Sequence, residues 1–433
     1  MKTTSIDTPL VSVLQDSFVE KENNSKNDKI ELASKRKEAF QLFSATGIPS
    51  PKNEEWKYTN LASLVKEKFS FEIGKLSKDE VQKHFLAFEA YHVVILNGIF
   101  NKEYSQLPTA STEFEIKGLN EMDGATLQNY FARKAYSSND GMSLLNTAFS
   151  ENGICIEVKK GKTVSKPVIL YFINDCRKEN TLVQPRILVI ANGNSSLSLI
   201  ETFVTIGSHT DFTNIITEIV LKQEAHVDYH KIQDGAVNSY HVGTTEILHE
   251  AKSTSNSTTI TLGGAITRNN LNITLDAEHC EAYLNGLYLI NGKQHVDNHT
   301  VADHAKPNCY SNELYKGIMD DHSTGVFNGK ILVRLDAQKT NAFQSNKNIL
   351  LSKDASVNTK PQLEIFADDV KCSHGATTGQ LDNEALFYLQ SRGIGEKEAQ
   401  RFLLHAFAND VLERIKIEPL KELLLAKIEK RLV

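Results

Sequence analysis

The sequence predicts a mainly β protein, with a parallel β-helix core between an N-terminal mixed and helical region and a C-terminal helical region. From about residue 151 to 366, short alternating apolar and polar runs recur between Asn, Gly and Asp, without helical periodicity. A span of roughly two hundred residues is large for one β-sandwich. Stacked coils fit it better, because each coil buries its inward side chains against the next.

The N-terminal region is expected to comprise a flexible tail over 1–30 and a mixed, partly helical domain over 31–150. The polar run from Lys21 to Lys29 favours a frayed tail. An apolar stripe then indicates a helix from Glu31 to near Gly47, and two prolines break the pattern. Further helical pieces are expected near 78–88 and 124–137.

The C-terminal region, 367–433, shows three helical patterns. Asp382 is a suitable N-cap for the first helix, which Gly393 ends. Glu396 and Glu398 favour the start of the second helix, and Pro419 suits the first turn of the third. The apolar stripes of the last two helices are Ala399, Phe402, Leu403, Ala406, Phe407 and Val411, and Leu420, Leu423, Leu424, Ile428 and Leu432.

Composition limits the function. The chain has 433 residues, a formal net charge of −6 and no basic stripe with interleaved aromatics, which argues against a nucleic-acid binder. No apolar run approaches the roughly 20 residues that span a bilayer, and no export signal is recognisable, so a cytoplasmic protein without membrane contact is expected. Five scattered cysteines without a C-x-x-C pair fit a reducing compartment and exclude a self-contained zinc finger.

One histidine-rich strand is predicted around residues 225–230. His226, Asp228 and His230 share one face, and the opposite face is apolar and expected to lie in the core. These side chains are suitable ligands for zinc or iron. A polar outer face of a β-helix gives the same pattern, and we favour that interpretation.

A second cluster lies between His295 and His304. Alternation brings His295, Asp297 and His299 together on one face. Such a group could hold a metal. A hydrogen-bonded polar ladder along a coil edge is the alternative, and we favour it because Asn and His side chains readily satisfy backbone groups.

The segment from Asp368 to Asp382 carries a Cys-x-His step. If it is extended, Cys372 and His374 point to the same face, where both could hold a soft metal or a sulfur species. Two ligands do not close a site that requires four, so any metal here would be shared or transient. A buried cysteine beside a hydrogen-bonded histidine is the structural alternative.

Several enzyme classes lack their motifs. The sequence has no P-loop, no dinucleotide fingerprint and no nucleophile elbow. A β-helix hydrolase or lyase acting on a polysaccharide remains the enzyme alternative. It would need paired carboxylates on a groove, whereas Asp320 and Asp321 would point to opposite faces of a strand.

The chain resembles the SufB/SufD family of iron–sulfur cluster assembly scaffold proteins, on its SufD side, from about Arg36 to Ile415. The resemblance rests on many motifs that occur along the chain in the order found in the family. They are Gly47-Ile48-Pro49, Glu54-Glu55-Trp56-Lys57-Tyr58-Thr59, Thr267-Arg268-Asn269-Asn270-Leu271-Asn272, Leu284-Asn285-Gly286-Leu287-Tyr288, Gln294-His295-Val296-Asp297-Asn298-His299-Thr300, Glu313-Leu314-Tyr315-Lys316-Gly317, Gly325-Val326-Phe327-Asn328-Gly329-Lys330, Gln338-Lys339-Thr340-Asn341-Ala342 and Lys360-Pro361-Gln362-Leu363-Glu364-Ile365.

The resemblance implies a right-handed parallel β-helix and a scaffold, not an enzyme. It implies pairing with a SufB-like paralogue and docking of a SufC-like ATPase through the C-terminal helices, where we expect Phe387, Arg401, Phe402 and Phe407 to contribute. It further implies a transient iron–sulfur cluster shared with the paralogue, with Cys372 and His374 at the interface. The sequence leaves open whether the isolated chain forms a homodimer.

The SufB side of the family is the rival within this resemblance. B-type chains carry a sulfur-handling cysteine in the segment that matches Phe343–Lys347, where this sequence has none. They also place a carboxylate directly after the histidine, where this sequence has Gly375. Both departures favour the SufD side.

Overall fold

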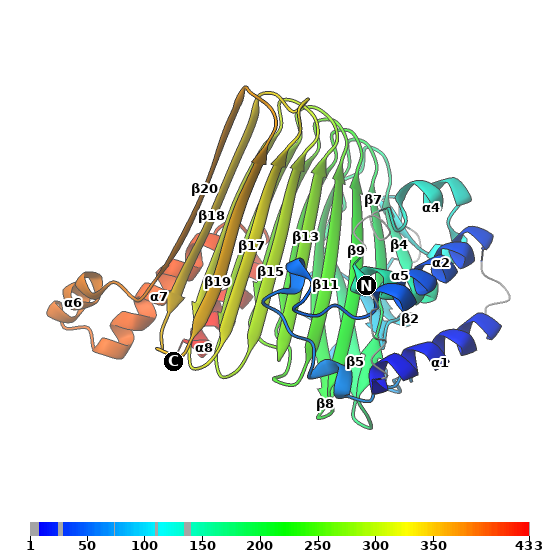
Figure 1. Cartoon of the computed structure of the whole chain (residues 1–433), viewed down its shortest axis with the longest axis horizontal. Coiled ribbons are helices and arrows are strands. Elements are labelled where there is room, and N and C mark those ends of the chain that lie inside the picture. Colours follow the sequence, from blue (N-terminus) through cyan, green and yellow to red (C-terminus); the bar gives the residue numbers. More distant parts are fainter. Residues whose placement is uncertain (1–7, 25–28, 73, 109–110, 134–139, 433) are drawn as a thin grey trace.

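The computed structural model describes residues 8–24, 29–72, 74–108, 111–133 and 140–432. The chain forms a parallel β-helix of about eight turns with helices at both ends of the sequence (Figure 1). The predicted mainly β class, with its β-helix core and helical ends, is confirmed. No helix in the described ranges is long and apolar enough to cross a membrane.

Two sheets form the walls of the β-helix in the described part of the chain, and successive strands alternate between them through most of the core. One sheet contains, in spatial order, β2 (Ile99–Gln106), β1 (Tyr91–Leu96), β5 (Val168–Cys176), β8 (Ser196–Gly207), β10 (His226–Gln233), β12 (Thr254–Thr261), β14 (Glu281–Ile290), β16 (Tyr310–Met319), β18 (Thr340–Leu350) and β20 (Val370–Gly379). The other contains β19 (Ser356–Ile365), β17 (Thr324–Val333), β15 (His295–His304), β13 (Ile266–Leu275), β11 (Tyr240–His249), β9 (Asp211–Leu221), β7 (Arg186–Ala191), β4 (Ile154–Val158) and β3 (Phe114–Gly118), with β6 (Thr181–Val183) paired to β9.

The coils have no strict sequence period. Residues in register along the first sheet are Ser196, His226, Thr254, Glu281, Tyr310, Asn341 and Lys371. Successive members of this series are 30, 28, 27, 29, 31 and 30 residues apart. The turns between strands absorb these differences, while the strands stay in parallel register.

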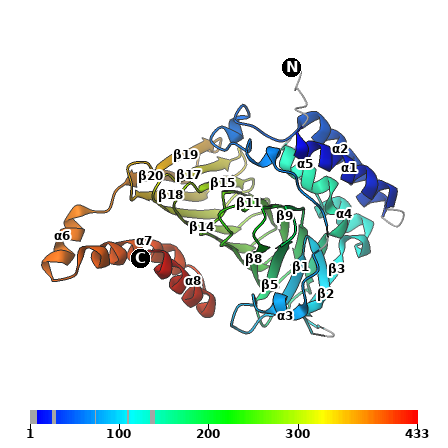
Figure 2. The same cartoon turned by 90° about the horizontal axis from the view of Figure 1, so that it is seen from below.

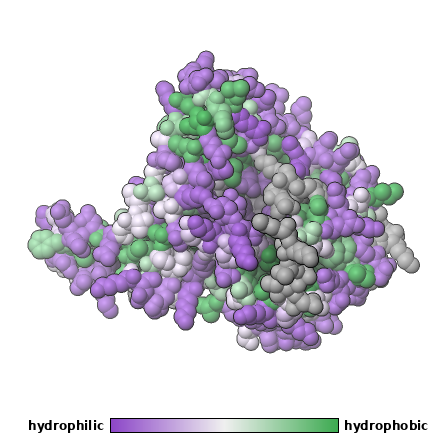
Figure 3. Space-filling view, viewed as in Figure 1, coloured by the Kyte–Doolittle hydropathy of each residue, from purple (hydrophilic) through white to green (hydrophobic). Residues whose placement is uncertain are grey.

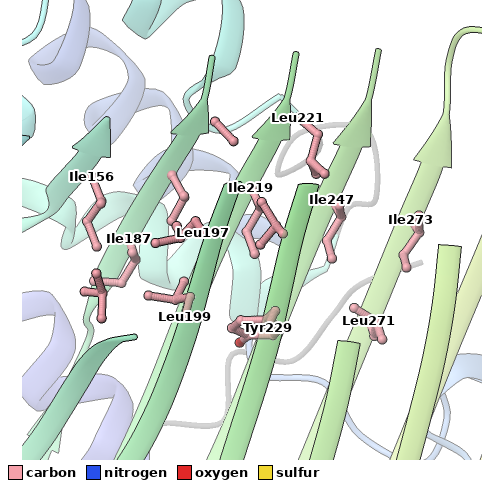
Figure 4. Packing of buried hydrophobic residues seen from close by; sticks show 14 of the residues in the cluster. Ile156, Ile187, Leu197, Leu199, Ile219, Leu221, Tyr229, Ile247, Leu271 and Ile273 are labelled. Atoms are coloured by element: carbon pink, nitrogen blue, oxygen red, sulfur yellow. The ribbon is translucent and has the colours of Figure 1, made fainter. Parts of the chain in front are cut away.

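The interior of the β-helix is filled by side chains from both sheets. Figure 4 shows aliphatic residues of both sheets that belong to this core, such as Ile187 on β7, Leu199 on β8 and Ile247 on β11. The apolar face predicted opposite His226, formed by Ala225, Val227 and Tyr229, belongs to this core. Alternation along each strand therefore places one set of residues inside and the other on the outer face.

A helical layer covers part of the second sheet at the N-terminal end. It comprises α1 (Pro9–Asn24), α2 (Ile30–Thr46), α4 (Gly124–Tyr130) and α5 (Gly141–Ala148), with the short elements α3 (Lys78–Gln82), η1 (Glu54–Trp56), η2 (Leu64–Lys66), η3 (Leu119–Glu121) and η4 (Ser150–Asn152) nearby in the chain. The expected tail over 1–30 differs from the structure, since α1 occupies 9–24. Leu10, Leu14 and Phe18 are buried, and the Phe18 ring stacks on Phe40 with centroids 3.8 Å apart. Residues 1–7, 25–28 and 134–139 lie outside the described ranges.

The C-terminal helices are α6 (Asn383–Ser391), α7 (Glu396–Leu412) and α8 (Glu418–Arg431). Asp382 caps α6 by accepting hydrogen bonds from the backbone N–H of Glu384 and Ala385, as the sequence predicted. Helices α7 and α8 pack on the outer face of the first sheet, whereas α6 extends away from the coils (Figures 1 and 2). Strand β20 continues the β-helix to Gly379, beyond the expected boundary at 366.

The apolar stripe predicted for α7 is displaced in the structure. The buried residues of this helix are Ala399, Leu404, Ala408, Val411 and Leu412. In contrast, the Phe402 side chain is 48% exposed. The stripe predicted for α8 agrees better with the structure, since Leu420, Leu424 and Ile428 are buried.

Candidate functional site

The last coil leaves one end of the β-helix open. β20 pairs with β18 and β19 pairs with β17, and neither has a partner on its other side among the described strands. Every residue from Ser373 to Gln380 is exposed. A strand edge of this kind presents unpaired backbone N–H and C=O groups that can accept a further strand.

Cys372 and His374 lie on the inward face of β20. Their register partners on β18 are Ala342 and Gln344, and both partners are buried. Cys372 is half-buried against an apolar cluster that includes Ala342 and Leu363, and burial raises the pKa of its thiol. His374 is exposed at the mouth of the coil. The structure thus brings a thiol and an imidazole to one face at the open end.

These two side chains do not form a complete metal site. In the ranges that the structure describes, no group of three or more His, Cys, Asp and Glu side chains could hold a metal ion. The other four cysteines, at 155, 176, 280 and 309, are buried and unpaired by disulfides. A ligand set of two at an exposed edge can be completed by groups from another molecule.

The first histidine cluster faces a C-terminal segment. His226 Nε2 lies 3.1 Å from Asp228 Oδ2, and Lys416, which follows α7, lies 3.7 Å from Asp228 Oδ1. His230 is buried, and burial lowers its pKa to about 4, so this imidazole is neutral at pH 7. The outer face of β10 is therefore a partly covered polar surface.

The second histidine cluster fastens the N-terminal segment 54–59, which we call the strap. Asp297 is buried and accepts hydrogen bonds from the Thr59 hydroxyl and from Arg268 Nη1, the latter at 2.6 Å. His299 lies 3.1 Å from Asp297 and 3.4 Å from Glu55. These contacts agree with the hydrogen-bonded polar ladder that we favoured from the sequence. The sequence did not predict that this ladder binds the strap.

Arg268 is the centre of this attachment. Besides Asp297, its guanidinium donates to the backbone carbonyl of Glu55 at 2.7 Å and stacks over the Trp56 ring at 4.3 Å. Lys360 on β19 adds an exposed ion pair to Glu54 at 2.9 Å. Four of the motifs behind the resemblance, at 54–59, 267–272, 294–300 and 360–365, are thus in contact with one another, and these contacts hold the strap on the β-helix.

The residues predicted to bind a partner differ in their surroundings. Phe387 is 72% exposed on α6 and Phe402 is 48% exposed on α7. Arg401 is half-buried and lines a groove of about 1020 Å³ between the C-terminal helices and the coil turns. Phe407 packs on the first sheet, with Lys316 Nζ 4.3 Å from its ring centroid. Phe387 and Phe402 are therefore accessible to a partner protein, whereas Phe407 is part of the local core.

An open-ended β-helix without a complete metal site among its described residues is compatible with a scaffold protein. Comparison with known proteins identifies the family. The family model described as "SUF system FeS cluster assembly, SufBD core domain" matches residues 172–407, and the model of the "SufBD protein N-terminal region" matches residues 12–170.

Individual relatives agree with the family models. The chain is 34% identical over 404 residues to an iron–sulfur cluster assembly SufBD family protein of Synechocystis, covering 90% of this chain and 89% of the relative. It is 33% identical over 396 residues to the iron–sulfur cluster assembly protein SufD of Escherichia coli, covering 91% of both chains. The chain belongs to the SufBD family of iron–sulfur cluster assembly scaffold proteins.

Proposed function

We propose that this chain is a D-type scaffold subunit that pairs with a SufB-like paralogue through the open end of its β-helix. The observation that carries the proposal is the position of Cys372 and His374 on the inward face of the last coil. A nascent iron–sulfur cluster is the cargo at this junction. The thiol and the imidazole of this chain supply part of its ligand set, and the paralogue supplies the rest.

The geometry of the open end supports pairing with a second chain. β19 and β20 each present a long edge that can extend the sheets of a partner. Three apolar side chains are exposed where strands of the second sheet end: Leu335 follows β17, Ile365 is the last residue of β19, and Phe366 follows it. Figure 3 shows apolar residues gathered at the upper end of the molecule. Backbone pairing flanked by an apolar contact is a suitable basis for a stable interface.

Docking of a SufC-like ATPase is the second part of the proposal. Helix α6 extends from the coils and exposes Phe387 and Tyr388, and Phe402 is exposed on the adjacent helix α7. Closure of the ATPase on nucleotide would pull on α6 and α7, which follow β20 directly in the chain. The pull would shift the population toward an interface that exposes Cys372 and His374.

Anaerobic reconstitution tests this function. The purified chain is combined with a SufB-like paralogue, a SufC-like ATPase, Fe²⁺ and sulfide, and the visible absorption of the cluster is measured on the complex after size-exclusion chromatography. We expect this chain to enter the complex and to raise the cluster yield over the same mixture without it. Exclusion from the complex, or an equal yield without the chain, would contradict the proposal.

Substitutions of two phenylalanines on α7 distinguish an effect on ATPase docking from an effect on folding. Phe402→Glu should weaken ATPase binding by about tenfold, roughly 1.4 kcal/mol, with little change in thermal stability, because the side chain is half-exposed. Phe407→Glu should destabilise the C-terminal region by about 2 to 4 kcal/mol, because it places a carboxylate in the packing against the first sheet. Calorimetric titration with the ATPase and thermal unfolding measure the two effects. Unaltered binding of Phe402→Glu would exclude this face of α7 as the docking surface.

A further inference from the structure

A column of inward side chains ends at His374. Leu284 on β14, Glu313 on β16, Gln344 on β18 and His374 on β20 are consecutive register partners. Because the strands are parallel and in register, these side chains project from the same wall of the interior at intervals of about 4.8 Å. Glu313 and Gln344 are 3% and 4% exposed, so two buried polar residues lie directly behind the histidine at the mouth.

The structure accommodates the amide of Gln344 specifically. Its Nε2 donates a hydrogen bond of 2.8 Å to Glu313 Oε2. On the opposite wall, a Cβ atom at Gly329 would lie 2.4 Å from the same Nε2 and 2.7 Å from the Phe327 ring. A glycine at this position therefore leaves the space that the Gln344 side chain occupies.

The other end of the amide is unpartnered. Gln344 Oε1 is buried and accepts no hydrogen bond from any residue that the structure describes. Burying an acceptor without a donor costs about 1 to 3 kcal/mol. Stability of the isolated chain therefore does not account for a glutamine at this position.

We propose that Gln344, oriented by Glu313, is a positioning residue for His374. When the exposed imidazole turns toward the coil interior, one ring N–H donates to the unpartnered Oε1 of Gln344, and the other ring nitrogen stays unprotonated toward the cluster. A histidine that binds a metal almost always donates its other N–H to a carbonyl or carboxylate, and the loss of that partner weakens metal binding by about 10-fold to 100-fold. The inference rests on the proposed function, because it assigns a role to the same histidine.

Glu313 determines which end of the amide faces outward. An ionised carboxylate accepts from the NH₂ end of Gln344, so the oxygen remains for His374. Burial raises the pKa of Glu313 to about 7, against the opposing effect of the hydrogen bond from Gln344. The experiment is therefore performed at pH 8, above this value.

The test uses the full-length chain labelled with ¹⁵N-histidine, and the His374 signals are assigned by comparison with His374→Ala. We expect the tautomer ratio of His374 to depart from that of free histidine in the wild type and to return to it in Gln344→Met. Asn348→Leu is the matched control, because Asn348 is an equally buried inward residue of β18 whose neighbour on β20 is Thr378. A free-histidine ratio in the wild type, or a ratio that Gln344→Met leaves unchanged, would overturn the assignment.

A second measurement addresses the cluster. In the reconstituted complex, Gln344→Met should lower the cluster yield about tenfold, and Asn348→Leu should not, at comparable thermal stability. An unchanged yield with Gln344→Met would overturn the positioning role. The tautomer measurement needs neither partner nor cluster. It therefore distinguishes failure of this inference from failure of the proposed function.

Discussion

Arg268→Ala should lower the free energy of unfolding by about 3 to 5 kcal/mol, because it leaves a buried carboxylate without its counter-charge. The Arg268 and Asp297 side chains are 3% and 1% exposed, and their charged atoms lie 2.6 Å apart. The same substitution removes the guanidinium that stacks on Trp56. The loss should therefore release the strap as well as weaken the β-helix.

Trp56 makes this effect directly measurable. It is the only tryptophan of the chain and is 4% exposed within the strap. Urea denaturation followed by tryptophan emission should show an earlier transition in Arg268→Ala, with a red-shifted native spectrum. Lys330→Ala is the control: Lys330 Nζ lies 2.8 Å from Glu364 Oε1, and both side chains are partly exposed, at 30% and 43%. A surface pair of this kind contributes about 0 to 1 kcal/mol, so equal losses in both variants would contradict the prediction.

The effect of Arg268→Ala on stability should depend on pH, because the carboxylate of Asp297 can be protonated. Burial by itself would raise the pKa of Asp297, but Arg268 and His299 outweigh it and hold the pKa well below its usual range. A depressed folded-state pKa contributes stability above the unfolded value of about 3.9, and this contribution is lost as the pH falls through the folded pKa. Without Arg268, burial dominates and protonation relieves the penalty. The stability difference between wild type and Arg268→Ala should therefore shrink from pH 7 to pH 5. A constant difference would mean that the charge of Asp297 is not its cause.

The strap illustrates a limit of prediction from sequence. Alternation correctly placed His295, Asp297 and His299 on one strand, because side-chain direction in a strand has a period of two. Their partners Glu55 and Thr59 are more than 200 residues away in the chain. Local patterns carry no information on such pairing, so the sequence could identify the ladder but not what it binds.

Helix packing shows the same limit at shorter range. Helix α1 was expected to be a tail because its polar residues dominate the composition, although Leu10, Leu14 and Phe18 are enough to anchor it. On α7 the three- and four-residue spacing predicts a stripe that includes Phe402, whereas the buried face contains Leu404 and Ala408. Spacing alone does not determine which face of the helix meets the sheet.

The candidate site was predictable in part for a similar reason. An extended segment with cysteine and histidine two residues apart requires that both face the same way. Whether that face is inward, and whether its coil is the last one, depends on where the β-helix ends. The variable coil length, 27 to 31 residues, prevented the sequence from giving that position.

His374→Ala should lower the cluster yield of the reconstituted complex by about tenfold or more, while the isolated chain keeps its fold. The histidine is exposed, so truncation should change the free energy of unfolding by no more than about 0.5 kcal/mol. Loss of a ligand from a shared site removes coordination that the partner does not replace. Cluster absorption and thermal unfolding are measured on the same preparation.

The adjacent residues of β20 provide the comparison. Lys371→Ala changes an exposed side chain on the opposite face of the strand and should leave the yield unchanged. Cys372→Ala distinguishes a ligand from a packing residue: a loss equal to that of His374→Ala indicates a second ligand, and a normal yield indicates a thiol that only fills space against Ala342. If His374→Ala assembles clusters as well as the wild type in a complex of unchanged composition, the open end still serves as a pairing surface, but the imidazole is not part of the cluster site.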